Sequence, residues 1–135
     1  MKKRTLNFYK IVSIATSLIF IYLFSELFFN SESFVLDIGL QPSETVSILC
    51  RRTSIFMLGL SILLFCSKNI QHSKARQFIC LSTGITMIGL ACSGSYELFR
   101  GTVNLSILQA IIIETTLGVS FLIIHFMNRK VKIIQ

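Results

Sequence analysis

The sequence predicts an all-α fold, a four-helix transmembrane bundle that runs up and down with both termini in the cytoplasm. Four long apolar runs alternate with short polar segments, and the charges of those segments are sorted by sign. Ten of the 13 Lys and Arg residues lie before the first run, between the second and third, or after the fourth, and no Asp or Glu lies there. Short basic segments stay in the cytoplasm during membrane insertion. The sorting therefore places these three segments inside the cell and the acidic segments outside.

The composition supports a membrane protein. With 53% hydrophobic residues, 14% charged residues and a mean hydropathy of +0.73, the chain is too apolar for a soluble domain of 135 residues. The formal net charge of +7 is concentrated at the helix ends and forms no basic stripe with interleaved aromatics, so nucleic acid is not expected as a partner. We predict one membrane domain over 1–135, whose basic residues contact lipid headgroups.

The first span is expected at about 8–29. It carries no charge between Lys10 and Glu26 and is long enough to cross the hydrocarbon core. A basic start followed by an apolar run is also typical of a secretory signal peptide. No small-x-small cleavage site follows Leu23, so we expect an uncleaved helix.

The second span is expected at about 46–66, after an acidic segment over 30–45. That segment still carries apolar residues, so we expect it to lie along the outer interface. Pro42, Ser43 and Glu44 predict the start of the helix, because Pro suits the first turn and acidic groups suit the positive end of the helix dipole.

The third and fourth spans are expected at about 77–96 and 105–127. Small and hydroxylated residues recur at helical spacing along the third span, where they would allow close contact with another helix in lipid. This predicted packing face consists of Ser82, Thr86, Gly89 and Ser93. The fourth span contains a single acidic residue, Glu114, near its middle.

Charged residues of three spans fall at a similar depth. Counted from the cytoplasmic helix ends at about 1.5 Å per residue, Glu26, Arg51 and Glu114 lie roughly 20 to 24 Å from the inner boundary, with Arg52 next to Arg51. Charges exposed singly to lipid are costly. We therefore predict that these four residues cluster inside the bundle, with arginine–glutamate pairs as the natural geometry.

Three interpretations of this layer stay open. It is a fixed internal brace, or Arg51 and Arg52 extend to the outer headgroups, or Glu114 is a proton site. Tyr96 and Glu97 are candidate partners at the outer end of the third span. His125 lies on the same stripe as Glu114, but about 16 Å away along the helix, and is expected at the interface.

No motif supports enzymatic chemistry, since HExxH, GxSxG, a paired intramembrane Asp motif and a phosphate-binding Gly loop are all missing from the sequence. His72 is expected to be solvated and the four cysteines to be free thiols, so neither a metal site nor a cofactor is predicted. The residues favour a structural, binding or accessory membrane protein, with lipids, a second copy or another membrane protein as partner. The alternative is a small proton-coupled transporter using Glu114.

Several segments carry a resemblance to known proteins: Leu49-Cys50-Arg51-Arg52 before Met57-Leu58-Gly59-Leu60, the basic loop to Arg76, the third span ending Gly94-Ser95-Tyr96-Glu97, and the fourth span centred on Glu114. In these features the chain resembles small four-helix integral membrane proteins of bacteria, catalogued as domains of unknown function. The resemblance covers most of the chain and implies a bacterial inner-membrane protein, with no activity attached. Small multidrug exporters are less similar, because they have a Glu within the first helix, whereas Glu26 lies near its far end.

Overall fold

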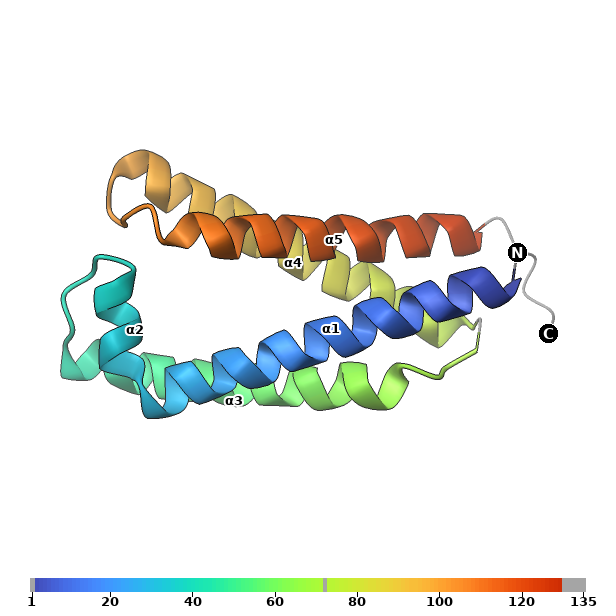
Figure 1. The fold of residues 1–135 in the computed structure, drawn as a ribbon, viewed down its shortest axis with the longest axis horizontal. Coiled ribbons are helices and arrows are strands. Elements are labelled where there is room, and N and C mark those ends of the chain that lie inside the picture. Colours follow the sequence, from blue (N-terminus) through green and yellow to red (C-terminus); the bar gives the residue numbers. More distant parts are fainter. Residues whose placement is uncertain (1, 72, 130–135) are drawn as a thin grey trace.

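The computed structural model describes residues 2–71 and 73–129, with side chains described for 6–71 and 73–127. These residues form five helices: α1 (Lys2–Phe29), α2 (Ser31–Asp37), α3 (Glu44–Ser67), α4 (Lys74–Arg100) and α5 (Ile107–Arg129) (Figure 1). Four are long and apolar enough to cross a membrane, over Leu6–Phe29, Glu44–Ser67, Lys74–Arg100 and Ile107–Met127. The predicted all-α fold with four apolar spans is confirmed. His72 lies outside the described residues.

Local sequence signals set the helix ends. Ser43 Oγ accepts a hydrogen bond from the Val46 backbone N–H at 3.3 Å, so α3 begins directly after the predicted start signal. Ser73 caps α4 in the same way, accepting from the Arg76 N–H at 3.3 Å. Gly101 ends α4 with a left-handed φ of +71°, a conformation that glycine adopts without strain. These caps lengthen α4 beyond the predicted span at both ends.

Serine side chains join α1 to α3. Ser17 Oγ donates to the Ser61 backbone carbonyl, and Ser61 Oγ is placed equally close to the Ser17 carbonyl, each at 2.9 Å. Ser47 and Ser54 precede Ser61 at seven-residue intervals, and all three are buried. Small residues let two helices approach closely in lipid, and their hydroxyls then bond across the contact. The antiparallel α1–α3 hairpin is therefore held by a row of small polar residues.

Glycines allow α4 and α5 to approach each other closely. A Cβ added at Gly84 would lie 2.9 Å from Leu122 side-chain atoms, and one added at Gly118 would lie 2.8 Å from Ile88 Cδ1. Each glycine thus receives a branched side chain of the facing helix. The two helices form a second antiparallel hairpin, with its closest contact near the middle.

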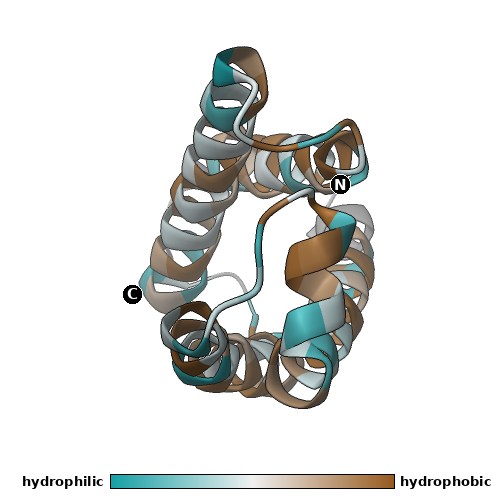
Figure 2. Cartoon of the chain, turned by 90° about the vertical axis from the view of Figure 1, so that its left-hand side faces the viewer, coloured by the Kyte–Doolittle hydropathy of each residue, from teal (hydrophilic) through white to brown (hydrophobic). Residues whose placement is uncertain are grey.

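The two hairpins meet at one end of the molecule and diverge toward the other (Figure 1). We call the first end, where α1 and α4 begin and α3 and α5 end, the basal end, and the opposite end, with α2, the distal end. The apolar core joins both hairpins nearer the basal end; its buried members are Tyr9, Val12, Phe20, Leu64, Cys80, Met87, Phe121 and Ile124. Figure 2 views the molecule from the distal end, with α2 and the connecting loops nearest the viewer.

A second tie joins the hairpins at the distal end. Asn104, in the loop between α4 and α5, donates from Nδ2 to the Asp37 carbonyl at 2.8 Å and from its backbone N–H to the Ile38 carbonyl at 2.9 Å. The segment after α2, predicted only as an outer interface loop, therefore also connects the two hairpins. Between the basal core and this tie, the hairpins face each other without close helix packing.

Candidate functional site

The predicted charged layer is divided between the two hairpins. Arg51 and Arg52 are exposed, and Glu26 and Glu114 are half-buried. Within the described part of the chain no hydrogen bond or ion pair joins these four side chains to one another. Glu26 and the arginines belong to the α1–α3 hairpin, whereas Glu114 belongs to the α4–α5 hairpin, and the hairpins diverge toward this depth (Figure 1). A similar depth along the helices does not bring the charges together laterally.

Glu114 lies on the side of α5 that faces α4. On this stripe Ile111 contacts Gly94 and Gly118 contacts Ile88, and Glu114 falls between them in helical spacing. Its carboxyl makes no hydrogen bond or ion pair with the described part of the chain. The structure therefore gives Glu114 a helix–helix position without giving it the partner that a brace requires.

Tyr96 and Glu97 lie near the distal end of α4. Thr102 Oγ1 donates a hydrogen bond to the Glu97 carboxylate at 2.5 Å, and the Arg100 guanidinium lies 5.6 Å from the centre of the exposed Tyr96 ring. Both contacts are local to the α4 terminus and its loop. They stabilise the turn into α5 and involve neither Glu26 nor Glu114.

The predicted packing face of α4 is exposed in the structure. Ser82, Thr86, Gly89 and Ser93 are all exposed in this chain, and a Cβ added at Gly89 would meet nothing within 4 Å. The buried residues of α4 instead lie on the adjacent face of the helix. They are Arg76, Cys80, Thr83, Gly84, Met87 and Ala91. On this second side of α4, Ile88 and Met87 pack against Gly118 of α5, and Gly84 packs against Leu122 of α5.

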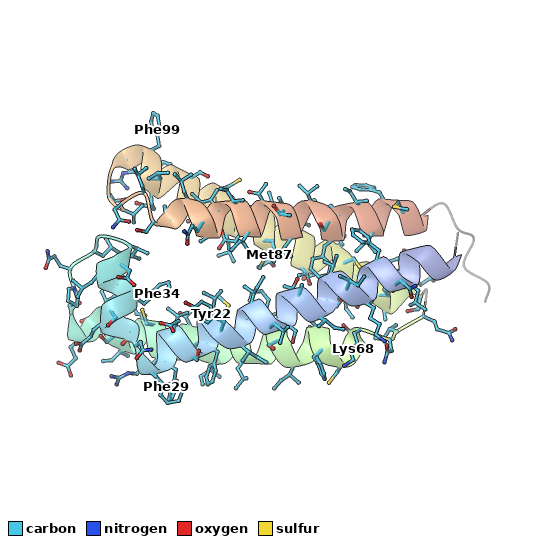
Figure 3. All side chains as sticks on the ribbon, in the orientation of Figure 1. Tyr22, Phe29, Phe34, Lys68, Met87 and Phe99 are labelled. Atoms are coloured by element: carbon cyan, nitrogen blue, oxygen red, sulfur yellow. The ribbon has the colours of Figure 1, made fainter. Side chains whose placement is uncertain are left out.

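A groove lies between the hairpins, beside the small-residue face of α4. Its volume is about 260 Å³. It is lined by Phe20 of α1, Leu60 and Leu63 of α3, and Phe78, Ile79, Ser82, Thr83, Thr86 and Met87 of α4. Figure 3 shows Met87 on α4, in the space between the two hairpins. Six of the nine lining side chains are apolar, so the groove fits an apolar molecule.

A buried polar cluster at the basal end was not predicted. The Tyr9 hydroxyl donates to Ser67 Oγ at 2.9 Å, and the Arg76 guanidinium lies over the Tyr9 ring, 4.5 Å from its centre. Arg76 is only 1% exposed and also interacts with Cys80. A guanidinium over an aromatic face is an attractive contact, stronger when both groups are desolvated. The signal in the sequence was an arginine in the first turn of a helix, which suggests a topology marker more readily than a buried contact.

His125 of α5 contacts α4 near this cluster. Its Nδ1 lies 3.1 Å from the Gln77 backbone carbonyl, and because a carbonyl can only accept, Nδ1 carries the proton. His125 is 9% exposed, so it belongs to the helix contact and not to the open interface that the sequence suggested.

The described residues hold neither a cluster of metal-ligating side chains nor a disulfide. Within the described residues no three His, Cys, Asp or Glu side chains stand close enough to hold a metal ion. Cys50, Cys66, Cys80 and Cys92 are free thiols. Comparison of the chain with protein-family models, curated proteins and solved structures found no match. The geometry of the groove is therefore the main basis for a functional proposal.

Proposed function

We propose that the protein is a multi-pass membrane protein that acts as a binding or accessory component, taking an apolar membrane molecule into the groove between its two hairpins. The proposal includes the predicted placement: an up-and-down bundle in a bacterial inner membrane, with both termini in the cytoplasm. The observation that carries it is the groove, lined by α1, α3 and α4.

The packing of the helices supports a binding role. Each hairpin is closely packed within itself, through Ser17 and Ser61 in one and Gly84 and Gly118 in the other. Away from the basal core and the Asn104 tie, the hairpins leave apolar side chains uncovered. The groove volume of about 260 Å³ is slightly smaller than that of typical small-molecule sites, which run from roughly 300 Å³ upward. This size suits a slender apolar chain.

Filling the groove tests the proposal. Ser82→Phe and Thr86→Phe should prevent the apolar molecule from entering, because both positions line the groove. Cys92→Phe is the matched control, since Cys92 is exposed on the same helix but outside the lining. Native mass spectrometry should detect a bound lipid-soluble molecule on the parent and on Cys92→Phe, and much less on the filled variants. Equal retention by all of them would contradict the proposal.

Glu114 favours a second candidate, the proton-coupled transporter. Its half-buried carboxyl lacks a hydrogen-bond or ion-pair partner in the described chain, as a group that exchanges a proton would. In vesicles with an imposed pH gradient, Glu114→Gln should slow proton entry relative to the parent, whereas Glu32→Gln on the exposed surface of α2 should not. Identical proton entry with the parent and Glu114→Gln would remove this candidate.

A further inference from the structure

We propose that the groove binds one acyl chain of an anionic phospholipid, whose phosphate is held by Lys74 at the basal end. The inference rests on the proposed function and names the ligand of the same groove. It follows from three observations: the length of the groove, the position of Lys74, and the absence of acidic residues along this part of the chain.

The groove runs along α4 for a distance that matches one leaflet. Its lining extends from Phe78 to Met87, nine residues and about 14 Å along the helix. The hydrocarbon core of a bilayer is roughly 30 Å thick, so each leaflet contributes about half of that. An acyl chain that enters at the basal end would therefore occupy the groove along most of its own leaflet.

Lys74 lies at the basal mouth of the groove. It is the first residue of α4 and comes four residues before the groove-lining Phe78, so the two side chains are neighbours on the helix surface. Lys74 lies about 6 Å from Phe78 along the helix axis. Lys68 follows the end of α3 and is placed differently, because its Nζ lies 3.2 Å from the centre of the ring of Phe65, an exposed residue that does not line the groove. Lys74 is therefore placed to meet a headgroup at this mouth.

The charge around this mouth is complementary to a phosphate. No acidic residue occurs between Glu44 and Glu97, a stretch that includes all of the groove-lining residues of α3 and α4. Lys74 is exposed and makes no ion pair with a carboxylate in the described part of the chain. An apolar groove that ends at a cation fits an anionic lipid better than a neutral lipid or an apolar helix of another protein.

Because the chain contains no Trp, one introduced tryptophan reports the lipid at a chosen position. Phe78→Trp places the reporter in the groove, and Phe56→Trp, at an exposed position outside the lining, serves as the matched control. Each variant is reconstituted into phosphatidylcholine vesicles that contain brominated phosphatidylglycerol or brominated phosphatidylcholine. Brominated chains quench tryptophan fluorescence on contact. The dependence of quenching on the mole fraction of brominated lipid therefore compares the affinity of the two lipids for each position.

At Phe78→Trp, brominated phosphatidylglycerol should quench at a mole fraction roughly fivefold below that needed for brominated phosphatidylcholine, because a lysine near an anionic headgroup is worth a factor of about five in affinity. Lys74→Gln should abolish this preference at Phe78→Trp. Lys68→Gln should leave the preference intact, because Lys68 contacts Phe65 outside the groove lining. Phe56→Trp should show no preference in any of these backgrounds.

Equal quenching of Phe78→Trp by both lipids would overturn the headgroup assignment while leaving the groove a lipid site, as the proposed function requires. Quenching by neither lipid, with Phe56→Trp still quenched, would show that the groove excludes lipid and would overturn both proposals. A preference that survives Lys74→Gln, or that Lys68→Gln removes equally, would contradict the role of Lys74 in binding the phosphate.

Discussion

Gly118→Val is expected to destabilise the protein strongly, because it forces α4 and α5 apart at their closest contact. A Cβ at this position would lie 2.8 Å from Ile88 Cδ1 and 3.1 Å from Met87 Cβ. The Ile88 side chain can rotate, but Met87 Cβ is fixed by the α4 backbone, so the helix itself must move. Overpacking of this kind typically costs about 1 to 3 kcal/mol, and more where backbone must shift. Thermal unfolding in detergent measures the loss.

Gly89→Val is the matched control for this prediction. It introduces the same β-branched side chain into the same hairpin, at a position where a Cβ would meet nothing within 4 Å. We expect it to melt close to the parent. If Gly89→Val proved as damaging as Gly118→Val, the contact face of α4 would have been assigned to the wrong side.

Ser61→Leu is expected to have the second large effect, by separating α1 from α3. Each serine of the Ser17–Ser61 pair places its hydroxyl 2.9 Å from the other's backbone carbonyl, so the two backbones are too close for a leucine between them. The expected loss is about 2 kcal/mol or more, from overpacking together with the lost hydrogen bonds.

Two companion variants separate these contributions. Ser61→Ala removes the hydroxyl but fits the space, so it should cost only about 0.6 to 2 kcal/mol, the range for hydrogen bonds between membrane helices. Thr53→Leu, at an exposed position on α3, should stay within about 0.5 kcal/mol of the parent. A Ser61→Leu protein as stable as Thr53→Leu would show that the serine contact does not hold the hairpin.

The sequence predicts the helical fold and its approximate boundaries because both depend on local signals. Ser43 and Gly101 mark helix ends through backbone geometry that adjacent residues determine. The lengths of the apolar runs then define four candidate spans. These features need no knowledge of which helix lies beside which.

The sequence predicts least well which faces of the helices pack against one another. Small residues occur on two faces of α4, and the face with Gly84 is favoured over the face with Gly89 by two residues of α5, Gly118 and Leu122. Depth along a helix can be counted from the sequence, but the direction of Arg51 relative to Glu114 depends on the divergence of the hairpins. The basal cluster was missed for the same reason, since Tyr9, Ser67 and Arg76 come from three separate helices.

The most direct test of the account is the lipid accessibility of the two faces of α4. Single cysteines carrying a nitroxide label at Thr86 and Ser93 report the face beside the groove, and labels at Cys80 and Ala91, which are buried and do not line the groove, report the buried face. Oxygen dissolves in the bilayer and broadens the spectrum of exposed labels. We expect high oxygen accessibility at Thr86 and Ser93 and low accessibility at Cys80 and Ala91. The reverse pattern would show that the groove face is closed and would contradict the proposed binding site.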